Sequence, residues 1–284
     1  MSNHIFIFGL GYVGRHLAAA LSMRGWKITA TTRQPEKLNQ KVPESWTILP
    51  FQAGEKLEIF DEHFSEATHL LSTITTVSDS DPVLELYGPE IKKFSGWAGY
   101  VSATSVYPDQ PDGWVDENTM PAPVTARGKA RLTAEQKWQE YTNAEVFRLA
   151  GIYGPQRNPF AELLEGTARI IDKPNQVFNR IHQTDISQIL IAGMDKPRPG
   201  RVMNLADGRP ASQGDVLSYA AGLLGINPPA SIPFETADLS PMARSFFSSC
   251  RRVRSNIIGP ELGLELVYPD YKKGLEAILA EQNF

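Results

Sequence analysis

Cysteine and long apolar runs are what this sequence has least of. Its single cysteine, Cys250, cannot form a disulfide within the chain, and one thiol excludes a zinc site built from several thiolates. No apolar run approaches the ~20 residues that a membrane-spanning helix needs. The N-terminus also lacks the basic region followed by an apolar core that marks a secretory signal. We therefore expect a cytoplasmic protein in a reducing compartment, without membrane association.

Sustained stretches of one charge are missing as well. The net charge of −4 comes from 28 lysines and arginines interspersed with 32 aspartates and glutamates. Without a basic stripe there is no electrostatic footprint for nucleic acid. The five histidines lack the spacing of metal ligands, so no metal site is predicted. We expect neither nucleic acid nor metal as a partner.

What the chain does have is an alternation of strand and helix patterns over 284 residues, of which 42% are hydrophobic. Short apolar runs predict strands at 5–8, 27–31, 47–51, 69–74, 99–102, 146–149 and 202–205. Helical spacing predicts helices at 13–24, after the second strand, at 83–94, 129–141 and 161–171, and from Asp185 as an N-cap. This order predicts an α/β fold with a doubly wound parallel sheet.

A glycine turn separates the first strand from the first helix. In Gly9-Leu10-Gly11-Tyr12-Val13-Gly14, the first glycine permits a tight turn, the second lets the backbone approach a pyrophosphate, and the third allows close helix packing. The phosphates would lie at the helix N-terminus, which attracts anions. The pattern predicts a Rossmann-type dinucleotide site with contacts at Gly9, Gly11, Tyr12, Val13 and Gly14, whereas the alternative is a turn that serves packing alone.

The residues after the second strand favour NADP over NAD. A carboxylate there binds the ribose 2′-hydroxyl of NAD, whereas an arginine accepts the 2′-phosphate of NADP. Thr32 and Arg33 stand at this point, with no acid before Glu36, and Lys37 offers a third contact. We predict NADP as the cofactor, with NAD as the alternative. In the other interpretation, Arg33 lies on a solvated helix start.

Four later segments supply a family resemblance. They are VSATSVY at 101–107, RLAGIYGP at 148–155, RIHQTDI at 180–186 and VMNLADG at 202–208. With the glycine turn, they resemble the extended short-chain dehydrogenase/reductases, the NAD-dependent epimerase/dehydratase group that includes nucleoside-diphosphate-sugar epimerases. The resemblance implies a Rossmann domain at 1–155 and a smaller C-terminal substrate lobe at 156–284, with 183–206 returning to the first domain.

That resemblance also implies where further cofactor contacts lie. The nicotinamide is expected near the strand ends at Ser102 and Arg148. We further predict contacts from Ser72 and Thr73, at the end of the fourth strand, and from Tyr153. For Tyr153, a packing role is the alternative.

The catalytic positions of the family are altered in this sequence. The family pattern places a Ser or Thr after the fifth strand, and a Tyr followed four residues later by a Lys. Here Ala103, Arg127 and Arg131 fall on these positions, and arginine stays protonated, so Arg127 cannot be the general base. A shifted register would make Thr125 and Lys129 the pair.

The side chains at and beside the altered family positions suggest a site that binds an anionic substrate. Arg127 and Arg131, four residues apart on one helix, can clamp a phosphate or carboxylate, or they can form a solvated face. Thr104 and Ser105 offer hydroxyls beside Ala103, and Thr104 is the better candidate to orient a substrate. We predict an NADP-linked oxidoreductase or epimerase that acts on an anionic, sugar-like small molecule. The alternative is a noncatalytic sensor of cofactor redox state, and a homodimer is left open.

Overall fold

The computed structural model describes residues 3–38, 42–57 and 59–281. Two compact units make up the chain, and each is built from several segments. The first unit comprises Met1–Val106, Pro121–Arg148 and Ile186–Met203; the second comprises Tyr107–Met120, Leu149–Asp185 and Asn204–Phe284.

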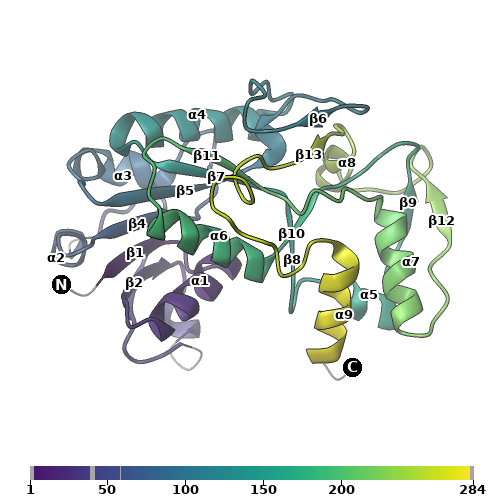
Figure 1. Ribbon diagram of the computed structural model, residues 1–284, viewed down its shortest axis with the longest axis horizontal. Coiled ribbons are helices and arrows are strands. Elements are labelled where there is room, and N and C mark those ends of the chain that lie inside the picture. Colours follow the sequence, from purple (N-terminus) through teal and green to yellow (C-terminus); the bar gives the residue numbers. More distant parts are fainter. Residues whose placement is uncertain (1–2, 39–41, 58, 282–284) are drawn as a thin grey trace. The chain divides into compact units, whose positions relative to one another are not determined.

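A seven-stranded sheet runs through the first unit and defines the fold (Figure 1). Its order is β11-β7-β5-β4-β1-β2-β3, and the pairs β3–β2, β2–β1, β1–β4 and β4–β5 are parallel. The strands are β1 His4–Phe8, β2 Lys27–Thr32, β3 Thr47–Pro50, β4 His69–Ser72, β5 Trp97–Ala103, β7 Glu145–Leu149 and β11 Val202–Leu205. Strand order reverses between β1 and β4, the point at which ligands bind in open α/β sheets. The predicted α/β fold of Rossmann type is confirmed.

Helices cover both faces of this sheet. The side chains of β1 alternate in direction, so apolar residues project from both faces. Phe6 and Phe8 enter an aromatic core with Phe60, Tyr87 and Trp138, which come from α2, α3 and α4. On the other face, His16 of α1 and Ser187 of α6 are joined by a 2.7 Å hydrogen bond. The helices are α1 Tyr12–Met23, α2 Phe60–Phe64, α3 Pro82–Ile91, α4 Ala126–Thr142 and α6 Gln183–Asp195.

The second unit is built from short strands in parallel pairs and a helical cluster. The paired strands are β8 Gly151–Tyr153 with β10 Arg180–His182, β9 Ile170–Asp172 with β12 Ser231–Pro233, and β6 Trp114–Val115 with β13 Arg252–Val253. Its helices are α5 Phe160–Leu164, α7 Gln213–Leu223, α8 Pro241–Phe246 and α9 Tyr271–Glu281. Phe160, Leu217 and Leu275 bring α5, α7 and α9 into one buried core.

Three local expectations were wrong. The region 161–171 is not one helix, because α5 ends at Leu164, Gly166 adopts a positive φ of 68°, and Ile170 begins a strand. Asp185 is not an N-cap, because α6 begins at Gln183. After β2 the described residues hold only a 3₁₀ turn, η1 Pro35–Lys37, and residues 39–41 of this region lie outside the description. Throughout the described ranges, no helix is both long and apolar enough to span a bilayer.

Candidate active site

The glycine turn lies at the reversal point of the sheet, directly after β1. Gly9 has a φ of 95°, a conformation that side-chain-bearing residues rarely adopt. Its amide nitrogen donates to Thr31 Oγ1 at 3.0 Å, and the Thr73 hydroxyl donates to its carbonyl oxygen at 2.7 Å. The ends of β2 and β4 therefore hold the turn in place from both sides.

The other two glycines have opposite surroundings. A Cβ at Gly14 would lie 2.3 Å from the Gly9 carbonyl oxygen, so only glycine lets α1 approach the turn this closely. A Cβ at Gly11 would have no neighbour within 4 Å among the described residues. The turn is thus closed at Gly14 and open at Gly11, which is the division of roles expected of a pyrophosphate-binding turn.

Helix α1 starts at the open glycine and is suited to an anion. Gly11 is its N-cap, and within the described part of the chain no side chain caps this end and no acidic residue lies in the first turn. Val13 is buried and Tyr12 is half-buried. The helix dipole and the first backbone N–H groups favour negative charge at such an end. The residues present here fit a dinucleotide pyrophosphate.

The end of β2 carries the residues expected to select the cofactor. Thr32 is half-buried, and its Oγ1 accepts a long 3.5 Å hydrogen bond from the Gln34 amide. Arg33 and Lys37 are exposed, and Glu36 lies in η1 after them. No acid precedes Glu36, so the charge at this strand end is positive.

Beside the turn, β4 ends in two hydroxyl residues with different roles. Thr73 binds the backbone of the turn, as described above. Ser72 is fully buried, and its Oγ has no hydrogen-bond partner within the described ranges. Contact of either residue with a cofactor remains a prediction.

A buried polar network connects β5, α4 and β7. Arg148 donates from Nη2 to Glu135 Oε2 at 2.7 Å and from Nε to Oε1 at 3.1 Å, while the Ser102 hydroxyl donates to Glu135 Oε1 at 2.5 Å. All three residues are buried. Ser102 is therefore already engaged with a carboxylate.

The two arginines of α4 differ in environment. Arg131 is buried, and its Nη1 donates to the Val101 carbonyl and the Tyr100 hydroxyl, both at 3.0 Å. Burial raises the pKa of Tyr100, so this phenol stays protonated and accepts the hydrogen bond through its oxygen lone pairs. Arg127 is exposed on the first turn of the helix. The guanidinium groups of Arg127 and Arg131 therefore lie in different environments, one exposed and one already bound to β5.

The hydroxyls near Ala103 lie in the 3₁₀ turn η2 Thr104–Val106, where Thr104 and Ser105 are half-buried. In the alternative register, Thr125 is the N-cap of α4 and accepts from the Gly128 amide at 3.1 Å, while Lys129 is exposed. Thr125 is thus already used to begin the helix, and the shifted register gains no support.

In the second unit, Tyr153 and His182 are packed together. Their rings lie 5.0 Å apart, and the Tyr153 hydroxyl donates to the Asp270 carbonyl at 3.1 Å. Burial raises the pKa of Tyr153. The Asp185 carboxylate accepts from the Val267 and Tyr268 amides at 2.7 and 3.2 Å, so it binds a distant segment rather than capping α6. Contact of Tyr153 with a cofactor stays a prediction.

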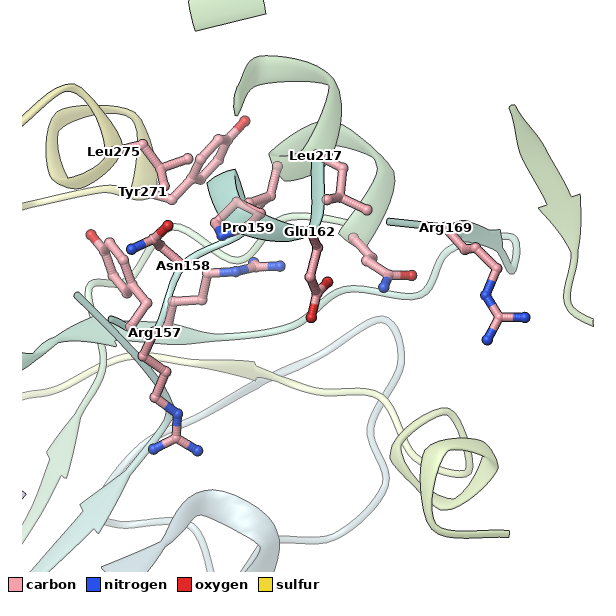
Figure 2. A pocket seen from close by; sticks show the side chains of 12 residues that line it. Arg157, Asn158, Pro159, Glu162, Arg169, Leu217, Tyr271 and Leu275 are labelled. Atoms are coloured by element: carbon pink, nitrogen blue, oxygen red, sulfur yellow. The ribbon is translucent and has the colours of Figure 1, made fainter. Parts of the chain in front are cut away.

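A pocket of about 250 Å³ lies wholly within the second unit (Figure 2). Arginines, tyrosines, amides and apolar side chains line it together. The lining residues are Tyr153, Arg157, Asn158, Pro159, Glu162, Arg169, Arg180, Gln213, Val216, Leu217, Tyr271 and Leu275. In the described ranges no group of three or more His, Cys, Asp or Glu side chains is placed to hold a metal ion.

Sequence reasoning missed Glu135, Arg180 and Gln213. A signal for Glu135 existed, because Ala130, Ala134 and Trp138 recur at helical spacing and mark the neighbouring face of α4 as buried. Arg180 and Gln213 carried no local signal, since the pocket brings together segments distant in sequence.

Comparison with known proteins agrees with this geometry, although no family model matches the chain. Solved structures from the epimerase and dehydratase group share the fold of this chain, as the sequence predicted. The human epimerase family protein SDR39U1, solved with NADPH, has this fold, with a TM-score of 0.70, 15% identity and coverage of 98% of this chain and 100% of that one.

Two relatives are closer in sequence. A functionally unknown conserved protein from Silicibacter pomeroyi DSS is 44% identical, with a TM-score of 0.92 and 99% of both chains covered. Protein YeeZ of Escherichia coli K12 is 27% identical over 94% of this chain and 96% of its own length. The chain belongs to the same family as the Silicibacter protein, and it shares its fold with SDR39U1.

Proposed function

We propose that this protein binds NADP(H) at the glycine turn and acts as an NADP-linked oxidoreductase or epimerase on an anionic, sugar-like substrate. One observation carries the proposal. The turn is closed at Gly14, where a Cβ would lie 2.3 Å from the Gly9 carbonyl oxygen, and open at Gly11, where the backbone must meet a phosphate. A turn that served packing alone would have no need of a glycine at the open position.

The end of β2 supports NADP rather than NAD. Arg33 is exposed and able to meet a 2′-phosphate with its planar fork, and the Thr32 hydroxyl lies beside it. A carboxylate for the ribose diol of NAD is missing before Glu36.

The chemistry must proceed without the Tyr and Lys of the family. When bound, the nicotinamide supplies hydride transfer, and the protein's own residues bind and orient the substrate. Nη1 of Arg131 is bound to Tyr100 and Val101 of β5, and in the described ranges its Nε and Nη2 have no acceptor. A guanidinium stays protonated, so Arg127 and Arg131 stabilise negative charge and transfer no proton. Thr104 is the hydroxyl we assign to orienting the substrate.

A second candidate is a noncatalytic sensor of cofactor redox state. Ala103 supplies no hydroxyl, and Nη1 of Arg131 already donates to the Val101 carbonyl and the Tyr100 hydroxyl. None of the three altered positions therefore provides a group that titrates near neutral pH.

Turnover separates the two candidates. Nucleotide sugars and other anionic alcohols and ketones are incubated with NADP(H), and hydride transfer and solvent-deuterium incorporation are followed. For an enzyme, Arg127→Lys raises KM more than it lowers kcat, because a point charge replaces a bidentate fork, and Lys137→Gln on the same helix changes neither.

A sensor gives the opposite pattern. Reduced and oxidised cofactor then differ in affinity, no substrate turns over, and Arg127→Lys leaves cofactor affinity unchanged. The variant Ala103→Ser, Arg127→Tyr, Arg131→Lys restores the family pattern. Reductase activity in this variant and not in the parent means that the natural protein has lost or replaced the family mechanism. Absence of NADP(H) binding contradicts both candidates.

A further inference from the structure

The pocket of the second unit contains a cation, Arg180, for which the described residues provide no ion pair. Arg180 Nη1 donates to the carbonyls of Phe178 and Ala211 at 2.9 and 3.0 Å, and Nη2 makes a 3.5 Å contact with the Ser212 carbonyl. Across the described ranges Arg180 forms no ion pair, and its Nε has no acceptor. Arg180 is half-buried, and burial lowers its pKa against the opposing effect of Asp207. A desolvated charge without a counter-charge is costly, so an anion bound there would stabilise the site.

Asp207, the carboxyl group that raises the pKa of Arg180 most, supplies this counter-charge only in part. The Asp207 amide donates to the Arg180 carbonyl at 2.8 Å, which places the two residues side by side. The pKa of Asp207 is raised to about 7, mainly by burial and also by the carboxyls of Asp270 and Asp185, against the opposing effects of the Arg209 amide and Arg180. Its Oδ2 is buried and has no hydrogen-bond partner in the described structure. Asp207 is therefore largely uncharged below neutral pH, and the positive charge of Arg180 persists.

A second donor in the pocket has a fixed orientation. Gln213 Oε1 accepts from the Ile171 amide at 3.2 Å, which defines which end of the side-chain amide is oxygen. Its Nε2 has no acceptor in the part of the chain that the structure describes. Gln213 and Arg180 thus present N–H groups and no acceptor, so the complementary ligand is rich in oxygen acceptors.

The remaining lining sets the size and charge of the ligand. Three arginines and one glutamate line the pocket, and Figure 2 shows Arg157 and Arg169 on opposite sides of Glu162. The excess of positive charge suits a dianion better than a monoanion. At about 250 Å³ the pocket lies below the ~300–1,000 Å³ of drug-sized ligands. Tyr271, Leu217 and Leu275 supply an apolar wall against which a compact carbon skeleton can pack.

We propose that this pocket binds a small phosphomonoester, whose phosphoryl oxygens accept from Nε and Nη2 of Arg180 and from Nε2 of Gln213. This ligand class makes the substrate of the proposed function more specific. That the bound phosphomonoester is the substrate rests on the proposed function. Binding itself needs no cofactor, because every lining residue belongs to the second unit.

Calorimetry without cofactor tests the inference. Glycerol 3-phosphate and glucose 6-phosphate are titrated into the full chain, with glycerol and glucose as uncharged controls. We expect binding of at least one phosphomonoester and of neither control. Gln213→Glu keeps the shape and the accepting oxygen but replaces the donor with a second oxygen, and it should weaken binding roughly tenfold to a hundredfold. Gln188→Glu, an exposed glutamine of α6, adds the same charge elsewhere and should change affinity less than twofold.

A second variant separates a loss of binding from a loss of folding. Arg180→Lys keeps the charge and loses the planar edge, so it should also weaken binding, and circular dichroism with thermal unfolding verifies the fold of each variant. Binding that survives unchanged in both folded variants overturns the assignment, as does the failure of both phosphomonoesters to bind at millimolar concentration. UDP-glucose that binds more tightly and displaces them assigns the pocket to nucleotide diphosphates and contradicts the small-ligand proposal.

The outcomes also separate this inference from the proposed function. Phosphomonoester binding without NADP(H) binding retains the pocket assignment and rejects the cofactor-linked function. NADP(H) binding without phosphomonoester binding rejects the pocket assignment alone.

Discussion

Arg148 and Glu135 form a bidentate ion pair inside the first unit, with Nη2 and Oε2 2.7 Å apart and both side chains almost fully buried. Ser102 donates to the same carboxylate. The pair joins the strand end of β7 to helix α4, which also carries Arg127 and Arg131. It therefore fixes the helix that bears the altered family positions.

Breaking this pair should be strongly destabilising. Arg148→Met leaves the Glu135 carboxylate buried without its counter-charge, and we expect a loss of about 3–5 kcal/mol in the free energy of unfolding. Arg24→Met is the matched control, because Arg24 pairs with Asp195 on the surface, with side chains 43% and 49% exposed, and should cost less than about 1 kcal/mol. Urea unfolding measures both variants. Equal losses for the two would contradict the structural role of the buried pair.

The closed position of the glycine turn makes a second stability prediction. Gly14→Ala places a Cβ 2.3 Å from the Gly9 carbonyl oxygen, so the variant should lose about 1–3 kcal/mol although alanine is the better helix former. Gly11→Ala, at the open position, should change stability much less. Thermal unfolding compares the pair, and a Gly14→Ala variant as stable as Gly11→Ala would show that the turn is looser than described.

Asp207 predicts a dependence of stability on pH. Its pKa is raised from 3.8 to about 7, so between these values the folded protein holds a proton that the unfolded chain has released. The free energy of unfolding should therefore fall as pH rises from about 4 to 7 and level off above that, with a ceiling of ~4 kcal/mol from the size of the shift.

Asp207→Asn tests this dependence, because an amide oxygen still accepts from the Arg209 amide. The variant should gain stability relative to the parent at pH 8 and lose that advantage at pH 4. Asp238→Asn, at an exposed aspartate, should leave the pH profile unchanged. Parallel profiles for Asp207→Asn and the parent would refute the raised pKa.

Cofactor selectivity should depend on Arg33. Arg33→Ala removes a charge-assisted hydrogen bond to the 2′-phosphate, so NADP(H) affinity should fall by about 1.5–3 kcal/mol while NAD(H) affinity stays constant. Arg209→Ala removes another exposed arginine and should affect neither cofactor. The selectivity account fails if the parent protein binds both cofactors equally.

The elements of the first unit could be predicted because their signals are local. A strand with the apolar residues 5–8, a glycine turn and an amphipathic helix follow one another within 20 residues, and each keeps its pattern in the structure. The helix predicted at 161–171 failed for the opposite reason. Ile170 and Ile171 form a strand only because Ser231–Pro233 pairs with them, and this partner lies 61 residues away.

The candidate site was predictable only in part for the same physical reason. The spacing of Gly9, Gly11 and Gly14 in the sequence predicts their roles. The role of Glu135 is identified only through its ion pair with Arg148. Asp185 accepts hydrogen bonds from the Val267 and Tyr268 amides, more than 80 residues further along the chain. Sequence spacing gives no sign of contacts that only the tertiary fold creates.

The central claim is that the open position of the turn receives the pyrophosphate of NADP(H). Calorimetric titration of NADPH into the parent protein and into Gly11→Val tests it most directly, because a Cβ there has no neighbour within 4 Å among the described residues and the valine side chain would extend into the space proposed for the ligand. We predict saturable binding by the parent, and loss of binding in a variant whose circular dichroism matches that of the parent. A Gly11→Val protein that binds NADPH at the parent's strength would contradict the account.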